Sequence, residues 1–150
     1  MTTSVRRVFF LLTMMLFCEF HQTSYSADPV RVGIIGIDNY QSLAFTQLWH
    51  KPPADNPDLV GLKVVAAWKG GSLDIKETLV DVERWAPHLM KQGVTFEDSI
   101  NDVLEKCDAV MIMSIDGRSH LKTAEQALKA GKPTYIGRPM AASLEDVIAI

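Results

Sequence analysis

The sequence predicts an α/β fold, a doubly wound parallel sheet of the Rossmann-like type. Three observations lead to this fold class. From Pro29 onward, short apolar runs alternate with longer helix-like segments, which is the pattern of repeated β-α units. The apolar runs leave almost no polar face, as in strands that helices cover on both sides. The first run also leads through a glycine-containing turn into a helix.

Each apolar run is predicted as one strand. The first is rich in valine and isoleucine, and the fourth is the uninterrupted apolar stretch from Ala109 to Met113. Both patterns are typical of buried, parallel strands. In chain order, the predicted strands cover residues 30–37, 62–68, 94–96, 109–113 and 133–136.

The segments between the strands are predicted as helices, and several carry signals at their ends. Ser99 and Ser143 each precede an aspartate by three residues, a spacing that resembles a capping box. Pro87 is expected to interrupt the long polar helix around it. The helix before the fifth strand is expected to bury an apolar stripe of Leu121, Ala124, Ala127 and Leu128. The predicted helices run through residues 43–48, 75–92, 99–106, 119–130 and from 143 to the end, and a proline-rich loop at 51–58 ends the first.

The composition indicates one ordinary globular domain. The chain has 150 residues, of which 47% are hydrophobic and 22% charged, so it has enough apolar material for a core. The formal net charge is −3 and basic residues do not cluster, which argues against a nucleic-acid partner because such proteins neutralise phosphates with basic patches. No Cys/His cluster has the spacing of a zinc site, so no metal is expected. The expected partner is a small molecule.

Residues 1–27 resemble a signal peptide, and residues 28–150 are expected to form the domain. Arg6 and Arg7 make a cationic start, an apolar run follows, and small residues lead to Ala27. The protein is therefore predicted to be exported, to a periplasmic or extracellular location. The arginine pair is similar to a twin-arginine signal. The alternative is an uncleaved signal that anchors the protein to the membrane, although the apolar run has only about half of the ~20 residues that a spanning helix needs.

The turn after the first strand has part of a dinucleotide-binding motif. In the full G-x-G-x-x-G motif, backbone N–H groups and the positive end of a helix face a pyrophosphate. Gly36 supplies the first glycine, Ile37 follows it, and Asp38 and Gln41 stand at the positions of the other two. A carboxylate at the second position adds bulk and repulsion where a phosphate approaches. Alternatively, Gly33 and Gly36 only permit close packing of the strand against a helix.

The end of the second strand has a lysine where dinucleotide-binding proteins commonly have an acidic residue for the adenosine ribose. The sequence there is Trp68-Lys69-Gly70-Gly71-Ser72. Lys69 and Ser72 would suit the 2′-phosphate of NADP. Lys69 is equally well explained as an ordinary solvated lysine.

Residues 114–141 resemble a known family. Ser114 to Asp116 follow the fourth strand, His120 comes four residues later, the helix ends in Ala130-Gly131-Lys132, and the next strand leads to Gly137-Arg138-Pro139. This order resembles the Gfo/Idh/MocA oxidoreductases, the relatives of glucose-fructose oxidoreductase and inositol dehydrogenase, over residues 30–150. The resemblance implies an NAD or NADP cofactor and a sugar, cyclitol or polyol-like substrate. It implies that the cofactor is bound by Gly36, Ile37, Asp38, Lys69, Ser114, Ile115, Asp116, His120, Arg138 and Pro139.

The resemblance also implies which part of an active site this chain holds. Arg138 takes the position of the family's catalytic lysine. It keeps the positive charge and can hold an oxyanion, but it is a poor proton shuttle because it is almost never deprotonated. The family's C-terminal α/β substrate domain completes the active site and would support a homo-oligomer. That domain is expected to be absent from this chain, which looks truncated.

Several alternatives stay open at the level of sequence. The chain is either part of an NAD(P)-dependent enzyme or a non-catalytic Rossmann scaffold that binds a ligand or partner, and a methyltransferase-like protein is a more distant possibility. His120 either contacts the cofactor or only satisfies the start of its helix. His50 and His88 are expected to be exposed residues at helix ends.

Overall fold

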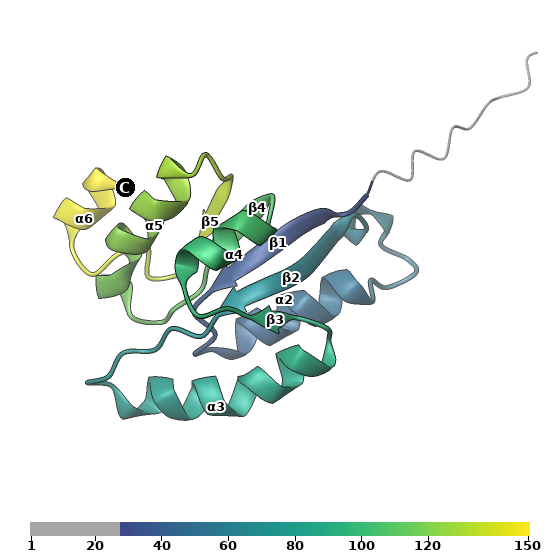
Figure 1. Cartoon of the computed structure of the whole chain (residues 1–150), viewed down its shortest axis with the longest axis horizontal. Helices are drawn as coiled ribbons and strands as arrows, with labels where there is room; N and C mark the ends of the chain where they lie inside the picture. Colours follow the sequence, from purple (N-terminus) through teal and green to yellow (C-terminus); the bar gives the residue numbers. More distant parts are fainter. Residues whose placement is uncertain (1–27) are drawn as a thin grey trace, which may run out of the picture.

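The computed structural model describes residues 28–150, and the expected export signal at 1–27 lies outside the described residues. Five strands form one sheet in the order β3-β2-β1-β4-β5, and every neighbouring pair is parallel (Figure 1). This arrangement confirms the predicted Rossmann-like fold class. The strands are β1 (Val30–Ile35), β2 (Leu62–Trp68), β3 (Thr95–Phe96), β4 (Ala109–Ile112) and β5 (Thr134–Ile136).

Helices cover the sheet on both faces, which explains why its strands are apolar on both sides. Ile34 belongs to one buried cluster with residues of α2 and α3, and its neighbour Ile35 belongs to another with residues of α4 and α5. Successive strand residues point to opposite faces, so β1 contributes to both clusters. The helices are α2 (Tyr40–His50), α3 (Lys76–Lys91), α4 (Ile100–Lys106), α5 (His120–Lys129) and α6 (Leu144–Ala149), with 3₁₀ turns η1 (Pro57–Leu59) and η2 (Gly117–Ser119).

Both predicted serine caps are confirmed. The Ser99 hydroxyl accepts a hydrogen bond from the N–H of Asp102 at 3.2 Å and begins α4. The Ser143 hydroxyl accepts one from the N–H of Asp146 at 3.1 Å and begins α6. Each bond satisfies an N–H group that has no partner inside its helix.

Three predicted details of the elements are wrong. β1 ends at Ile35, two residues early, because Gly36 has a positive φ of 86° and leaves the extended conformation. α3 continues through Pro87. Pro87 and Glu83 are both exposed, so the Glu83 carbonyl, which has no N–H partner on Pro87, is open to solvent. Leu128 is 50% exposed, because the buried face of α5 consists of Ala124, Ala127 and the partnered polar residues His120 and Thr123.

Within residues 28–150, no helix combines the length and the apolar character needed to cross a membrane.

Candidate functional site at the carboxyl edge of the sheet

The ten residues predicted to bind a cofactor all follow the carboxyl ends of β1, β2, β4 and β5. Because the sheet is parallel, these ends meet at one edge. Open α/β sheets bind ligands at this edge, at the point where the strand order reverses. Here that point lies between β1 and β4. The candidate site is therefore built from the four loops at this edge.

Gly36 lies in the tightest part of this edge. A Cβ atom at this position would lie 2.0 Å from Oγ of Ser114 and 2.6 Å from its backbone nitrogen. The N–H groups of Gly36 and Ile37 donate to the carbonyls of Trp68 and Lys69, each at 2.9 Å. Gly36 therefore has a packing role between β2 and β4, whatever ligand the turn holds. Gly33 has a similar role, since a Cβ there would lie 2.6 Å from Cγ1 of Val103 in α4.

Asp38 is buried at the start of α2, with 1% of its surface exposed. Its carboxylate oxygens lie 3.3 and 3.4 Å from the N–H of Ile115, which donates to them. Burial raises the pKa of the Asp38 carboxyl, and its backbone hydrogen bonds act in the opposite direction. The structure thus brings together Asp38 and Ile115, two of the predicted site residues.

Asn39 is a residue at this edge that the sequence analysis missed. Its side-chain oxygen accepts from the N–H of Ser42 at 3.3 Å and caps α2. Its side-chain nitrogen donates to the carbonyl of Met113, so it also ties α2 to the end of β4. An Asn just before a helix is a capping signal that was present in the sequence.

A set of polar contacts, termed here the loop bridge, joins the loop after β2 to the loop after β4. It consists of Ser72, Asp74, Asp116 and Arg118. The Ser72 hydroxyl donates to the Asp116 carboxylate. The Arg118 guanidinium donates to Asp74 at 2.8 and 3.0 Å and to Asp116 at 2.7 Å. Since β1 lies between β2 and β4 in the sheet, the loop bridge spans the region beyond the end of β1.

The positive charge of Arg118 stabilises the two carboxylates of the loop bridge. Hydrogen bonds from Arg118 hold the pKa of the Asp116 carboxyl well below its usual range, and they also lower the pKa of Asp74. The Ser72 hydroxyl is engaged by Asp116 rather than turned with Lys69 toward a ligand. Lys69 instead lies 3.8 Å from a carboxylate oxygen of Glu83, and 49% of its side chain is exposed.

His120 is fully buried between two loops of the site. Its Nε2 lies 2.8 Å from the carbonyl oxygen of Ser114, and its Nδ1 lies 3.1 Å from that of Met140. The ring therefore contacts backbone carbonyls on both sides and positions the loops after β4 and β5. Arg138 and Pro139, in the latter loop, are exposed and joined by a cis peptide bond.

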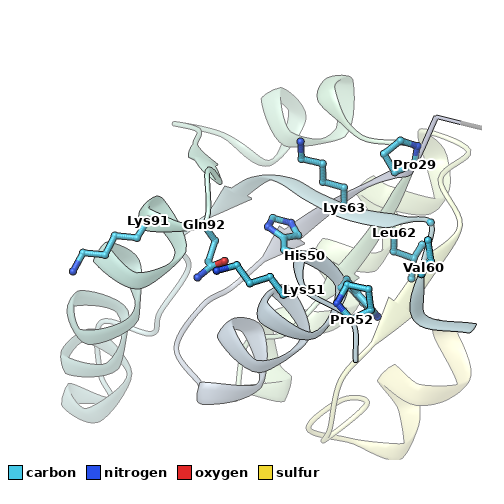
Figure 2. Close-up of a pocket in the computed structure, with 11 residues that line it drawn as sticks. Pro29, His50, Lys51, Pro52, Val60, Leu62, Lys63, Lys91 and Gln92 are labelled. Atoms are coloured by element: carbon cyan, nitrogen blue, oxygen red, sulfur yellow. The ribbon is translucent and has the colours of Figure 1, made fainter. Parts of the chain in front are cut away.

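A hollow of about 570 Å³ lies at the opposite edge of the sheet, away from the predicted site residues. Lys51, Lys63 and Lys91 line it but point in different directions (Figure 2). Lys51 and Lys91 lie at the ends of α2 and α3, where a positive charge complements the helix dipole. His50 lines it too and is half-buried, contrary to expectation, because its Nε2 accepts from the N–H of Val64 at 3.0 Å.

His88 is exposed, as expected. In the part of the chain that the structure describes, no three His, Cys, Asp or Glu side chains are grouped so that they would hold a metal ion.

The sequence was compared with protein-family models. The model of the Gfo/Idh/MocA oxidoreductase family, NAD-binding Rossmann fold, matches residues 30–150. The chain belongs to this family. It is thus a Gfo/Idh/MocA NAD-binding oxidoreductase domain, and the predicted family resemblance is confirmed. No curated protein sequence matched the chain.

Solved structures of an oxidoreductase domain protein and of two dehydrogenases share the fold. An oxidoreductase domain protein from Kribbella flavida matches with 24% identity and a TM-score of 0.60, over 82% of this chain and 30% of its own. UDP-N-acetylglucosamine 3-dehydrogenase from Acidithiobacillus ferrooxidans matches with 20% identity and a TM-score of 0.58, over 82% and 33%. Scyllo-inositol dehydrogenase from Lactobacillus casei, with bound NAD(H) and scyllo-inositol, matches with 23% identity and a TM-score of 0.55, over 81% and 31%. The chain thus spans about a third of the length of these proteins.

The residues at the carboxyl edge fit the family's dinucleotide in most respects. Gly36 presents no side chain, the N-terminus of α2 supplies a positive helix end, and the cations of Lys69 and Arg138 are exposed. Two residues depart from the full G-x-G-x-x-G motif, because Asp38 and Gln41 stand at the positions of its second and third glycines.

Proposed function

We propose that residues 28–150 are the NAD(P)-binding domain of an exported oxidoreductase that acts on a sugar, cyclitol or polyol-like substrate. The observation that carries the proposal is the gathering of the ten predicted cofactor residues at the carboxyl edge of a sheet of this family. The substrate class is supported by the names of the solved relatives, which include a dehydrogenase of a sugar nucleotide and one of an inositol. The activity proposed for the whole protein also needs residues that bind the substrate.

The positions of the residues suggest how they would share the cofactor. The turn at Gly36–Asp38 and the N-terminus of α2 would hold the pyrophosphate, and the loop at residues 114–116 would line the crevice beside it. Lys69 would approach the adenosine ribose, because its pair with Glu83 is long and exposed and therefore weak. When bound, the nicotinamide would supply the hydride chemistry.

Arg138 would lie on the nicotinamide side, at the exposed loop after β5. Its guanidinium stays protonated at all physiological pH values, so it would orient and stabilise a substrate oxygen that carries negative charge. It would not accept the proton that leaves a hydroxyl during oxidation. We therefore assign Arg138 to binding and place proton transfer on another group.

Cofactor binding is the direct test of this function. The full chain is titrated separately with NADH and with NADPH, and the fluorescence of the reduced nicotinamide is followed. Saturable binding of either cofactor is expected, and tighter binding of NADPH would assign Lys69 to the 2′-phosphate. No saturable binding of either cofactor at millimolar concentration would refute the proposal.

A second candidate function is a Rossmann scaffold that binds a ligand or partner without hydride transfer. Two observations favour it: the buried carboxylate of Asp38 in the turn, and Arg138 at the position of the family's catalytic lysine. The same titration separates the two functions, because a scaffold of this kind needs no nicotinamide.

Export is a further part of the proposal and rests on the sequence of residues 1–27. Expression in a bacterium, followed by cell fractionation and N-terminal sequencing, should recover a shortened protein outside the cytoplasm. A full-length protein in the membrane fraction would support the anchored alternative. The proposed homo-oligomer depends on the C-terminal domain, so size-exclusion chromatography would test it on a protein that includes that domain.

A further inference from the structure

Asp38 occupies the position in the turn that has the second glycine in a full dinucleotide motif. It directly precedes Asn39, the N-cap of α2, so its carboxylate lies near the positive end of that helix. Only 1% of the residue is exposed. Acidic residues are almost never buried to this extent unless they are paired.

The hydrogen-bond partner of the Asp38 carboxylate is a backbone N–H group. Ile115 donates to its two oxygens at 3.3 and 3.4 Å. The ion pairs found within residues 28–150 do not include Asp38. The charged or titratable groups that act on it are His120, which favours the carboxylate form, and Asp116, which opposes it. Asp38 is thus a buried carboxylate that the backbone N–H of a neighbouring loop holds beside the turn after β1, the turn that faces the phosphates in a dinucleotide motif.

We infer that the Asp38 carboxylate acts as an internal substitute for a cofactor phosphate and lowers the affinity of this domain for NAD(P). The inference rests on the proposed function, since it concerns the same cofactor site. A dinucleotide in the usual pose places its pyrophosphate against the N-terminus of the helix that follows the glycine turn. In this protein the pyrophosphate would meet a second anion at that point, in a place where burial strengthens repulsion between like charges.

Two substitutions separate the charge of Asp38 from its bulk. D38N keeps an oxygen that accepts the N–H of Ile115 and removes the charge. D38G removes both and restores the second glycine of the motif. The full chain and each variant are titrated with NADH at neutral pH, and the dissociation constant is read from the nicotinamide fluorescence. We expect binding to tighten about threefold or more in D38N and about tenfold or more in D38G.

A matched control guards against a general effect of net charge. Asp58 is exposed in η1, at the opposite edge of the sheet, so D58N makes the same change of charge without touching the turn. D58N should bind NADH as the parent protein does. Circular dichroism checks that all variants are folded. If D38G does not fold, the comparison of D38N with the parent protein is the test.

The outcomes separate this inference from the proposed function. If the parent protein binds NADH and the Asp38 variants bind it equally or less well, Asp38 does not oppose the cofactor, and the inference is wrong while the proposed function stands. If the parent protein and both variants fail to bind at millimolar NADH, the inference and the proposed function are both wrong. If only the Asp38 variants bind, the inference holds, and the parent protein is a scaffold whose cofactor site Asp38 keeps closed.

Discussion

Substitution of Gly36 by alanine should destabilise the protein strongly, because two separate penalties act at this position. An L-residue at the φ of 86° adopts a left-handed conformation that costs about 1–2 kcal/mol. The new methyl group would also lie 2.6 Å from the backbone nitrogen and 2.9 Å from the Cα of Ser114, so a rotation of the Ser114 side chain does not relieve the overlap. Overpacking of this kind costs a further ~1–3 kcal/mol. Together the loss is about 2–5 kcal/mol, against a typical total stability of about 5–15 kcal/mol.

A second glycine allows the two penalties to be measured apart. Gly93 has a φ of 83°, and a Cβ at that position would meet no atom within 4 Å. G93A should therefore cost only the conformational part, about 1–2 kcal/mol. Urea unfolding followed by circular dichroism gives the free energy of unfolding of the parent protein and of both variants. If G36A costs no more than G93A, the close approach of the β1 and β4 loops does not contribute to stability and the reasoning fails.

Three further predictions concern other contacts of the fold and site. Hydrogen bonds from Arg31 lower the pKa of Asp108 to about 2. The ionised Asp108 therefore stabilises the protein above the ordinary pKa of about 4, and this contribution is lost as the pH falls toward 2. Measurement of stability against pH should show this loss in the parent protein and not in D108N. H120L should lower the free energy of unfolding by about 1–3 kcal/mol, because it leaves the buried carbonyl of Ser114 without its hydrogen-bond partner. An unchanged urea midpoint of unfolding would contradict this. R118A should speed amide exchange in the loop after β2 while lowering stability by no more than about 1 kcal/mol, since Arg118 and Asp74 pair at an exposed position. Unchanged exchange in that loop would show that the bridge does not order it.

The sheet and the caps were predictable because they depend on local patterns. The apolar runs define strands whose predicted centres are correct, and a serine three residues before an aspartate marked the start of both α4 and α6. Each of these signals lies within a few neighbouring residues. The observed strand order agrees with the general rules for βαβ units, although the local patterns do not specify it.

The parts that were not predictable depend on contacts between distant residues. Arg118 and Asp74 are separated by 44 positions, and nothing in either local sequence indicates that they pair. The buried face of α5 was assigned only in part, because His120 is polar and its burial depends on carbonyls supplied by two other loops. The continuation of α3 through Pro87 depends on that residue lying on the exposed face, which the sequence pattern left open.

The fold and the cofactor chemistry of this domain depend on different residues, and Asp38 shows why. The core tolerates many apolar sequences as long as volume and pattern are kept, so relatives with identities of only 20 to 24% share the sheet. Asp38 leaves that sheet intact because the N–H of Ile115 accommodates its carboxylate. In the inference drawn above, the same carboxylate opposes the positive field that a phosphate would meet at the turn. Family membership therefore indicates where a dinucleotide would lie in this protein, whereas we propose that residue 38 sets how tightly it would be held.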